Sequence, residues 1–183
     1  MRIRIISGIF KGRFINVPQS KLLRPTADRV KETLFNLLNN KIDFEGINVL
    51  ELYAGSGSLG LECISRGAGA VTFVENNFLI CKNLKENIKS LKVENLCVIE
   101  KLKAVDFAKR IPQQKFNLIL ADPPYFKDDI YQVVENFKLN NYLKKNGLMI
   151  IERSIETKSA DIENFKFEPF KIIGDTCLYE LYE

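Results

Sequence analysis

Hydrophobic positions divide the chain into a short alternating segment and a longer series of apolar runs separated by helical stripes. Residues 2–17 alternate basic and apolar side chains, which predicts two short strands joined around Gly8 and Gly12. From residue 47 onward, short apolar runs alternate with stretches whose apolar side chains recur every three or four positions. This order of strands and helices is typical of an α/β fold with a mostly parallel sheet.

The same patterns give the bounds of the expected elements. Strands are predicted at about 48–53, 70–75, 96–99, 116–121 and 148–152, and helices at about 58–66, 78–91, 105–110 and 128–141. The tail predicts a helix around Ala160 and two strands, 166–173 and 176–182, that turn at Gly174. In helix 78–91 we expect an inward stripe made by Phe78, Cys81, Leu84, Ile88 and Leu91.

An earlier helix is expected between the alternating segment and the first long apolar run. Thr26 is its candidate N-cap, and Asn39 marks its expected end. Its buried stripe is predicted to consist of Val30, Leu34, Leu37 and Leu38.

The strand at 48–53 ends in a glycine turn that precedes a helix. Gly55, Gly57 and Gly60 form the pattern Gly-x-Gly-x-x-Gly, which allows a sharp turn and a close approach of a ligand to the backbone. The amide groups at the start of the following helix then point toward whatever binds over the turn. Strand, glycine turn and helix together are typical of a nucleotide-binding α/β unit.

Charges around the turn indicate the kind of nucleotide. Residues 53–60 contain no Lys or Arg, and Glu51 lies just before them, which disfavours a pyrophosphate and suits a ligand with a cationic end. S-adenosyl-L-methionine carries a sulfonium and an ammonium but no phosphate. Glu75 ends the next apolar run, 18 residues after Gly57, where a carboxylate commonly accepts hydrogen bonds from ribose hydroxyls. The alternative is that Glu51 and Glu75 are ordinary solvated strand ends.

Composition limits the remaining possibilities. Hydrophobic residues make up 46% of the 183 residues, enough for one sizeable core. No apolar run approaches the ~20 residues of a membrane span, and no signal-peptide pattern begins the chain. The chain has no His, and its 4 Cys are scattered, so we expect neither a metal site nor a disulfide framework. A reducing cytoplasm is the simplest location.

Positive charge is concentrated near the N-terminus. Residues 1–41 contain nine basic and two acidic side chains, a net charge of +7, whereas the remainder has a net charge of −3. Such asymmetry indicates a polyanionic partner such as nucleic acid, and the alternative is a solvated basic face. The candidate RNA-binding side chains are Arg2, Arg4, Lys11, Arg13, Arg24 and Arg29.

A second motif, Asp-Pro-Pro-Tyr at 122–125, follows the strand at 116–121. Ligands of doubly wound sheets bind beyond the carboxyl ends of the strands, so Asp122 should lie beside the glycine turn. The Asp122 carboxylate and the Pro123 carbonyl offer two acceptors for the hydrogens of an exocyclic amine, and Tyr125 offers a face on which a base can stack. Methyl transfer to such an amine requires that its nitrogen is aligned with the methyl group and that the charge developing on the nitrogen is stabilised. The base must also leave its stack to reach the site.

These motifs resemble those of a known family. Asp-Pro-Pro-Tyr matches the signature of amino-group methyltransferases, and three further stretches narrow the resemblance: 4–13, 23–35 and 51–57. Together they are similar to the bacterial small-subunit rRNA guanine-N2 methyltransferases of the RsmD type. The resemblance implies a Rossmann-like class I methyltransferase sheet of seven strands with an antiparallel C-terminal strand. It also implies that a guanine N2 in 16S rRNA is the target.

The resemblance also implies roles for individual residues. Glu51, Gly55 and Gly57 would hold the methionine end of the cofactor, Glu75 the ribose, and Asp122 and Tyr125 the base. The full expected cofactor site is Glu51, Ala54, Gly55, Ser56, Gly57, Glu75, Asn76, Ala104 and Asp122, with Asp122, Pro123 and Tyr125 as catalytic residues. Related enzymes often place Asp or Asn after the third strand to read adenine, but Lys103 is near that position here. No side chain is therefore assigned to the adenine amine.

The resulting hypothesis divides the chain into a basic RNA-binding extension, 1–41, and a methyltransferase domain, 42–183. The expected partner is 16S rRNA or the assembling small ribosomal subunit, and we expect a monomer without membrane or metal contacts. An adenine-N6 DNA methyltransferase is the main alternative, although the chain has little room for a separate target-recognition domain. A non-catalytic RNA-binding assembly factor is a further alternative, and an NAD-dependent dehydrogenase fits least.

Overall fold

The computed structural model describes residues 1–17, 26–124 and 128–183, with the side chains of 26–28 left out. The strands are β1 Arg2–Arg4, β2 Phe14–Asn16, β3 Asn48–Leu52, β4 Ala70–Val74, β5 Cys97–Glu100, β6 Phe116–Ala121, β7 Leu143–Ser154, β8 Lys171–Ile173 and β9 Thr176–Tyr182. The helices are α1 Thr26–Leu38, α2 Ser58–Ser65, α3 Phe78–Leu91, α4 Ala104–Ala108, α5 Asp129–Leu139 and α6 Lys158–Phe165, with 3-10 turns at Glu94–Leu96 and Ile155–Thr157.

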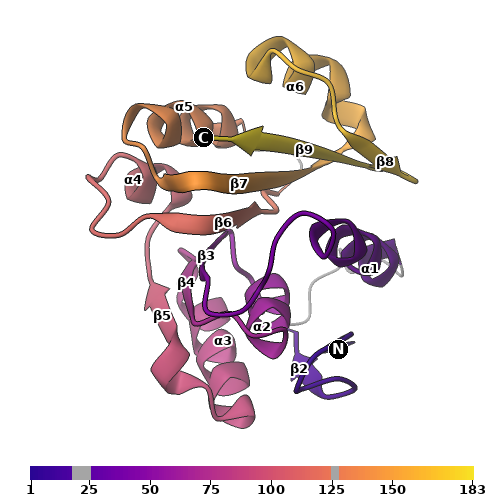
Figure 1. Ribbon diagram of the computed structural model, residues 1–183, viewed down its shortest axis with the longest axis vertical. Helices are drawn as coiled ribbons and strands as arrows, with labels where there is room; N and C mark the ends of the chain where they lie inside the picture. The colour runs from indigo at the N-terminus through magenta and orange to yellow at the C-terminus, as the bar shows by residue number, and fades with distance from the viewer. Residues whose placement is uncertain (18–25, 125–127) are drawn as a thin grey trace.

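Seven strands form one twisted sheet in the order β5-β4-β3-β6-β7-β9-β8 (Figure 1). Strands β3 to β7 are mutually parallel, whereas β9 runs antiparallel to both β7 and β8. The predicted α/β class, with a mostly parallel seven-stranded sheet and an antiparallel C-terminal strand, is confirmed. The chain order reverses between β3 and β6, so the carboxyl ends of these two strands flank the position where such sheets bind ligands.

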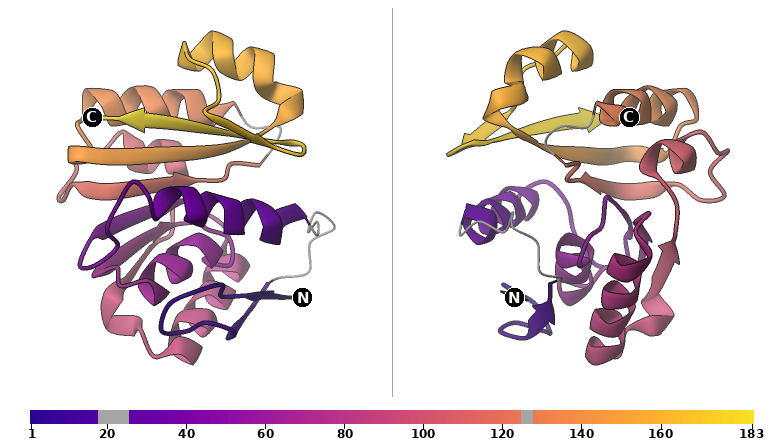
Figure 2. Two further views of the ribbon diagram at one scale, coloured as in Figure 1. Left: turned by 45° about the vertical axis from the view of Figure 1, so that its right-hand side comes forward. Right: turned by 180° about the vertical axis from the view of Figure 1, so that it is seen from behind.

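Helices cover both faces of the sheet (Figure 2). One hydrophobic cluster packs α1, α2 and α3 against the face that includes Val49, Leu120 and Ile150. A second cluster packs α4, α5 and α6 against the opposite face, which includes Ala121 and Ile151. Alternate residues of each strand thus enter different clusters, as expected for parallel strands that are buried on both sides.

The N-terminal segment shares the first of these clusters. Strands β1 and β2 form a small antiparallel hairpin whose Ile3, Ile5 and Ile15 are buried together with residues of α1 and α2. The Glu62 carboxylate of α2 accepts hydrogen bonds from the backbone amides of Ile6 and Ser7, at 2.8 and 3.0 Å. The division at residue 41 stays a prediction about roles, because the described part of residues 1–41 packs into the same core as the sheet.

Most predicted elements are present, with bounds that differ for local reasons. The strand expected at 148–152 begins earlier, at Leu143. β7 contains a bulge between Leu143, which pairs with Phe116, and Leu148, which pairs with Leu118. Asn146 adopts a left-handed φ of 62° within this bulge, so Asn146 and Gly147 interrupt the strand without ending it. The strand expected at 166–173 covers only Lys171–Ile173, because Lys166, at φ 70°, ends α6.

Two helical predictions need correction. Thr26 is the first residue of α1, not a residue that precedes it. Phe78 was expected to face inward, yet its side chain is 65% exposed, while Cys81, Leu84, Ile88 and Leu91 are buried as predicted. Phe78 begins α3 just beyond the end of β4, where the helical stripe has no sheet beneath it.

Candidate functional site

The predicted cofactor turn lies at the carboxyl end of β3 and has an unusual backbone. Tyr53, Gly55 and Gly57 all have positive φ values, 56°, 56° and 79°. The Gly57 amide donates to the Ala54 carbonyl at 2.7 Å, and the Ala54 amide donates to the Val74 carbonyl at 3.0 Å, which ties the turn to β4. A Cβ on Gly57 would lie 2.4 Å from Leu84, so the turn needs glycine for both space and φ.

Glu51 anchors the helix that follows this turn. Its buried carboxylate accepts hydrogen bonds from the Leu59 amide at 3.2 Å and the Gly60 amide at 2.8 Å. These amides belong to the first turn of α2, where a negative charge is stabilised. Burial nevertheless raises the pKa of Glu51 to about 8, against the lowering effect of the two hydrogen bonds. Both carboxylate oxygens are thus already used inside the protein, which the sequence did not reveal.

Glu75 joins the end of β4 to the same turn. Its carboxylate accepts from the Gly55 amide at 3.1 Å and from the Asn77 amide at 2.8 Å. Each oxygen keeps lone-pair capacity for a further donor, which suits the two hydroxyls of a ribose. Asn77 in turn caps α3 by accepting from the Leu79 and Ile80 amides. Glu75 and Gly55 are therefore brought together as predicted.

The other predicted cofactor residues differ in how far their side chains are exposed. Asn76 is exposed next to Glu75, whereas Ser56 is buried. The side chain of Ala104 is buried in the second cluster, on the face of the sheet that α4, α5 and α6 cover. Phe78, which the sequence placed in the core, instead exposes its ring near this edge with the Lys101 ammonium 5.3 Å from the ring centroid. An exposed aromatic residue at a helix start has no reliable signal in one sequence.

Asp122 follows the last residue of β6, and Pro123 after it is buried. Part of Asp122 is open to solvent, but loss of water around its carboxyl raises the pKa to about 6, with the positive charge of Arg153 opposing this shift. Tyr125, the predicted stacking residue, lies outside the described residues. Leu52 of β3 pairs with Ala121 of β6, so the glycine turn and Asp122 leave neighbouring strand ends as predicted.

Sequence reasoning missed a second carboxyl beside Asp122. Ala121 pairs with Ile151 of β7, so the next residues, Asp122 and Glu152, are neighbours. Burial, and then the negative charge of Asp122, raises the pKa of Glu152 well above its ordinary range. A polar residue at the end of a predicted apolar strand was the available signal, but the pairing of β6 with β7 was needed to interpret it.

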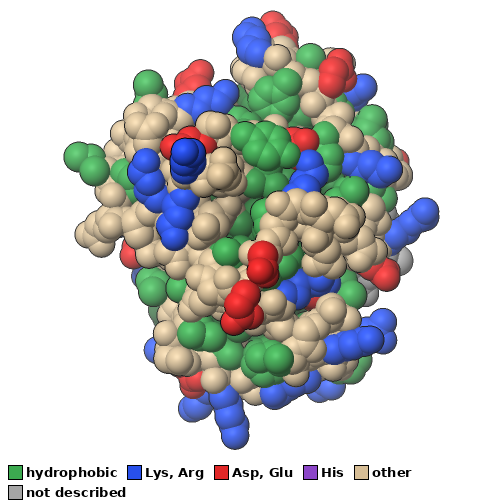
Figure 3. Space-filling view, in the orientation of Figure 1, with side chains coloured by type: hydrophobic (Ala, Val, Ile, Leu, Met, Phe, Trp, Pro, Cys, Tyr) green, Lys and Arg blue, Asp and Glu red, His purple; other side chains and the backbone are tan. Residues whose placement is uncertain are grey.

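Five of the six candidate RNA-binding side chains, Arg2, Arg4, Lys11, Arg13 and Arg29, are exposed. The guanidinium of Arg13 also donates to the Ser90 carbonyl at 2.6 Å, which fastens the hairpin to α3. Arg24 lies outside the described residues. Helix α3 and the residue that follows it add a group of exposed lysines that the prediction did not include: Lys82, Lys85, Lys89 and Lys92. Figure 3 shows Lys and Arg side chains gathered along the lower rim, over α3 and the hairpin.

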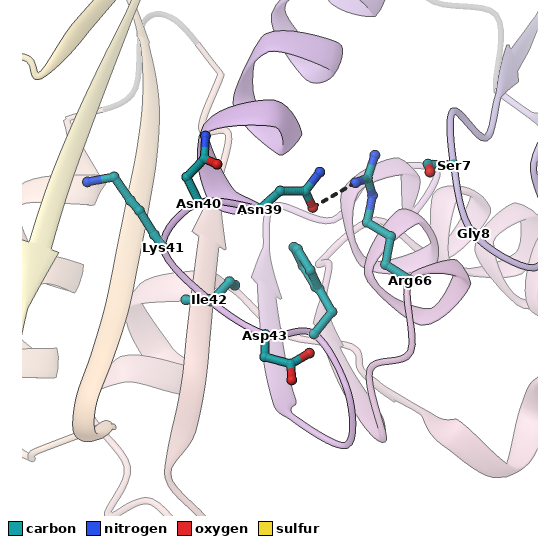
Figure 4. Close-up of a pocket in the computed structure, with 9 residues that line it drawn as sticks. Ser7, Gly8, Asn39, Asn40, Lys41, Ile42, Asp43 and Arg66 are labelled. Atoms are coloured by element: carbon teal, nitrogen blue, oxygen red, sulfur yellow. Dashed lines mark hydrogen bonds between the residues drawn. The ribbon is translucent and has the colours of Figure 1, made fainter.

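A separate pocket of about 630 Å³ lies at the opposite edge of the sheet, between the segment that precedes β3 and the end of α2 (Figure 4). Arg66 lines it and donates to the Asn39 side chain at 3.0 Å. The same guanidinium is paired with Glu62 at 2.9 Å and lies over the Phe35 ring. Its charge is therefore compensated within the protein, and the pocket does not add to the predicted site.

Two further findings concern other kinds of site. Among the described residues, no group of three or more His, Cys, Asp or Glu side chains is placed to hold a metal ion. No helix in the described part of the chain is long and apolar enough to cross a membrane.

Comparisons with known proteins agree with this geometry. A family model described as conserved hypothetical protein 95 matches residues 3–182. Ribosomal RNA small subunit methyltransferase D of Haemophilus influenzae is 38% identical over 184 residues, covering 99% of this chain and 93% of that protein. The protein of the same name from Escherichia coli K12 is 34% identical, covering 100% and 90%. A solved structure, the candidate methyltransferase yhhF from Escherichia coli, superposes with a TM-score of 0.84 at 28% identity, covering 100% of this chain and 98% of that one.

Proposed function

The chain belongs to the conserved hypothetical protein 95 family, whose relatives above are named ribosomal RNA small subunit methyltransferases, and on this premise we propose the details of its reaction. It is an rRNA methyltransferase that uses S-adenosyl-L-methionine. We propose that the acceptor is the exocyclic N2 of a guanine in 16S rRNA. The observation that carries this proposal is the Asp122–Pro123 pair beyond β6, one strand from the glycine turn that follows β3.

The residues at this edge fit the cofactor. S-adenosyl-L-methionine supplies an electrophilic methyl group on a sulfonium when it is bound. Glu75 and the Gly55 amide offer an acceptor and a fixed backbone for the ribose, and no Lys or Arg occurs in the turn at 53–60. We assign Glu51 an indirect role: it positions the turn and the α2 amides, because both of its oxygens are held by Leu59 and Gly60.

The remaining cofactor assignments follow from position. Gly57 and Ala54 shape the turn, and Ser56 contributes through its backbone. Asn76, next to Glu75, and the backbone at Ala104 flank the space where the adenine would lie. Lys103, extended before α4, does not supply the acidic or amide side chain that related enzymes use for adenine.

The protein contributes to this reaction mainly by aligning the acceptor nitrogen with the methyl group. The Asp122 carboxylate and the Pro123 carbonyl accept the two N2 hydrogens, which favours a pyramidal nitrogen whose lone pair faces the methyl group. As the carbon–sulfur bond breaks and the carbon–nitrogen bond forms, positive charge develops on N2 beside Asp122. One N2 proton then leaves, and Asp122 is the nearest acceptor in this arrangement. Tyr125 stacks on the base, which has left its own stack.

The basic extension is proposed to hold the RNA. Within residues 1–41, the hairpin of β1 and β2 is docked on α2 and α3 and exposes cations beside the catalytic domain 42–183, and phosphate contacts from them would position the RNA without reading its sequence. The lysines of α3 continue this surface. We also propose that a monomer acts on 16S rRNA or the assembling small subunit.

The proposal is tested with purified protein, S-adenosyl-L-methionine labelled in the methyl group, and either naked 16S rRNA or small-subunit particles. Digestion to nucleosides and mass spectrometry identify the product. We expect N2-methylguanosine from one site. Label in N6-methyladenosine would assign the adenine alternative, and unlabelled RNA from both substrates would indicate a non-catalytic factor.

A further inference from the structure

Glu152 and Asp122 face the same side of the sheet. Leu120 and Ile150 enter the cluster beneath α1 to α3, whereas Ala121 and Ile151 enter the opposite one. Because side chains alternate along strands, the next residues, Asp122 and Glu152, return to the side of Leu120 and Ile150. Glu51 of β3 lies on this side too, since its oxygens contact the first turn of α2.

Asp122 and Glu152 differ from the buried acids nearby in the partners of their carboxyl groups. Glu51 and Glu75 each accept two backbone hydrogen bonds, and Glu62 accepts two more at the hairpin. Neither Asp122 nor Glu152 forms a hydrogen bond or ion pair with any residue in the described part of the chain. Glu152 is half-buried although its carboxyl has no such partner there.

Charges around the pair favour one shared proton. Burial raises the pKa of both carboxyls, and the effect is larger for Glu152, where the Asp122 charge adds to it. Arg153 lowers the pKa of Asp122, but its guanidinium pairs with Asp161 at 2.9 Å. Glu51, which Asp122 also influences, adds a further acid on the same side. The two carboxyls follow paired residues of neighbouring strands and Glu152 is the more buried of the two, so this arrangement favours a protonated Glu152 beside an ionised Asp122.

A neutral carboxyl beside a carboxylate matches the edge of guanine. Guanine presents O6, N1–H and the N2 amine in a row, that is, one acceptor followed by donors. A protonated carboxyl carries one O–H donor and one carbonyl acceptor side by side. We propose that Glu152 is a second base-reading residue, whose carboxyl donates to O6 and accepts from N1–H of the guanine whose N2 faces Asp122. This inference rests on the proposed function, and it explains how the pocket would reject adenine, which has no O6 and no N1–H.

The test compares two substrates and three proteins. One RNA carries guanine at the target position, and the other carries 2-aminopurine there, which keeps the amine at C2 but lacks O6 and N1–H. The proteins are wild type, Glu152→Ala and Glu152→Gln, and Glu156→Ala serves as the matched control because Glu156 is an exposed acid four residues further on. Methyl transfer gives kcat/KM for each pair, and calorimetry gives the affinity for S-adenosylhomocysteine.

Wild type is expected to prefer guanine over 2-aminopurine roughly 10- to 100-fold, the effect of two neutral hydrogen bonds. Glu152→Ala should lose about that factor on guanine and little on 2-aminopurine, with S-adenosylhomocysteine affinity kept. Glu152→Gln should retain most guanine activity, because an amide offers the same donor and acceptor. Glu156→Ala should behave as wild type on both RNAs.

Three results would overturn the assignment. Equal losses on both substrates in Glu152→Ala would show a structural role, and loss of S-adenosylhomocysteine binding would place Glu152 at the cofactor. A Glu152→Gln variant as inactive as Glu152→Ala would show that an anion is required. If wild type methylates neither RNA, the proposed function itself fails, which is distinguishable from all three.

Discussion

Asn87 of α3 connects the N-terminal hairpin to the cofactor turn, and its removal should weaken both. Its buried side chain accepts from the Asn16 amide at 2.8 Å and donates to the Asn16 carbonyl at 2.8 Å, which imitates the pairing of a neighbouring strand. It also donates to the Ser56 carbonyl at 3.0 Å. Asn87→Ala removes these three hydrogen bonds and leaves their backbone partners partly buried.

The expected loss of stability follows from this count. Each bond contributes about 1 kcal/mol, and backbone groups left without partners add to the cost, so Asn87→Ala should lower the free energy of unfolding by about 2–4 kcal/mol. Urea denaturation should show a lower midpoint with an unchanged slope. Affinity for S-adenosylhomocysteine should fall as well, because Ser56 lies within the turn.

Asn83→Ala is the matched control one helical turn away. Asn83 is half-buried, and its contact with Asn87 is longer, 3.4 Å. We expect this variant to change the free energy of unfolding by less than about 0.5 kcal/mol. If Asn87→Ala were as stable as Asn83→Ala and bound S-adenosylhomocysteine normally, the proposed link between hairpin and turn would be wrong.

Three further predictions concern catalysis, pH and RNA binding. Asp122→Ala should reduce methyl transfer by roughly 10²-fold or more at near-normal S-adenosylhomocysteine affinity, and a wild-type turnover rate would place the active site elsewhere. Because the pKa of Glu51 is about 8 when folded and 4.5 ordinarily, the folded state binds more protons than the unfolded one, so stability falls as pH rises from about 5 to 8. Glu51→Gln should make urea midpoints less dependent on pH over that range, and an unchanged dependence would count against this pKa. Replacing three exposed cations by Gln should weaken binding to any RNA and make the log–log salt slope shallower by ~0.7–0.9 for each phosphate that the protein no longer neutralises, whereas an unchanged slope would mark a solvated face. The three are Arg2, Arg4 and Lys11.

Local patterns predicted the framework of the site. The strand ends, the glycine turn and the Asp122–Pro123 motif depend on residues close together in sequence, and parallel strands bring such ends to one edge. Helical periodicity was less reliable at a helix start: Phe78 fits the inward stripe, but the sheet ends beneath it.

Contacts between distant residues were not predictable from the pattern. Asn87 and Glu62 are polar residues on helices, and their partners in the hairpin are 71 and 55 or 56 positions away. Glu51 could be recognised as an acid before the turn, but its bonds to the α2 amides depend on how the helix folds back. Glu152 gained meaning only from the pairing of β7 with β6.

Mass mapping of modified guanines shows whether this chain methylates a guanine N2 in 16S rRNA, as we propose. 16S rRNA is compared between cells with and without the gene, and the gene is then restored as wild type or as Asp122→Ala. One N2-methylguanosine is expected to disappear with the gene and to return only with wild type. An unchanged set of N2-methylguanosines in cells without the gene would contradict it.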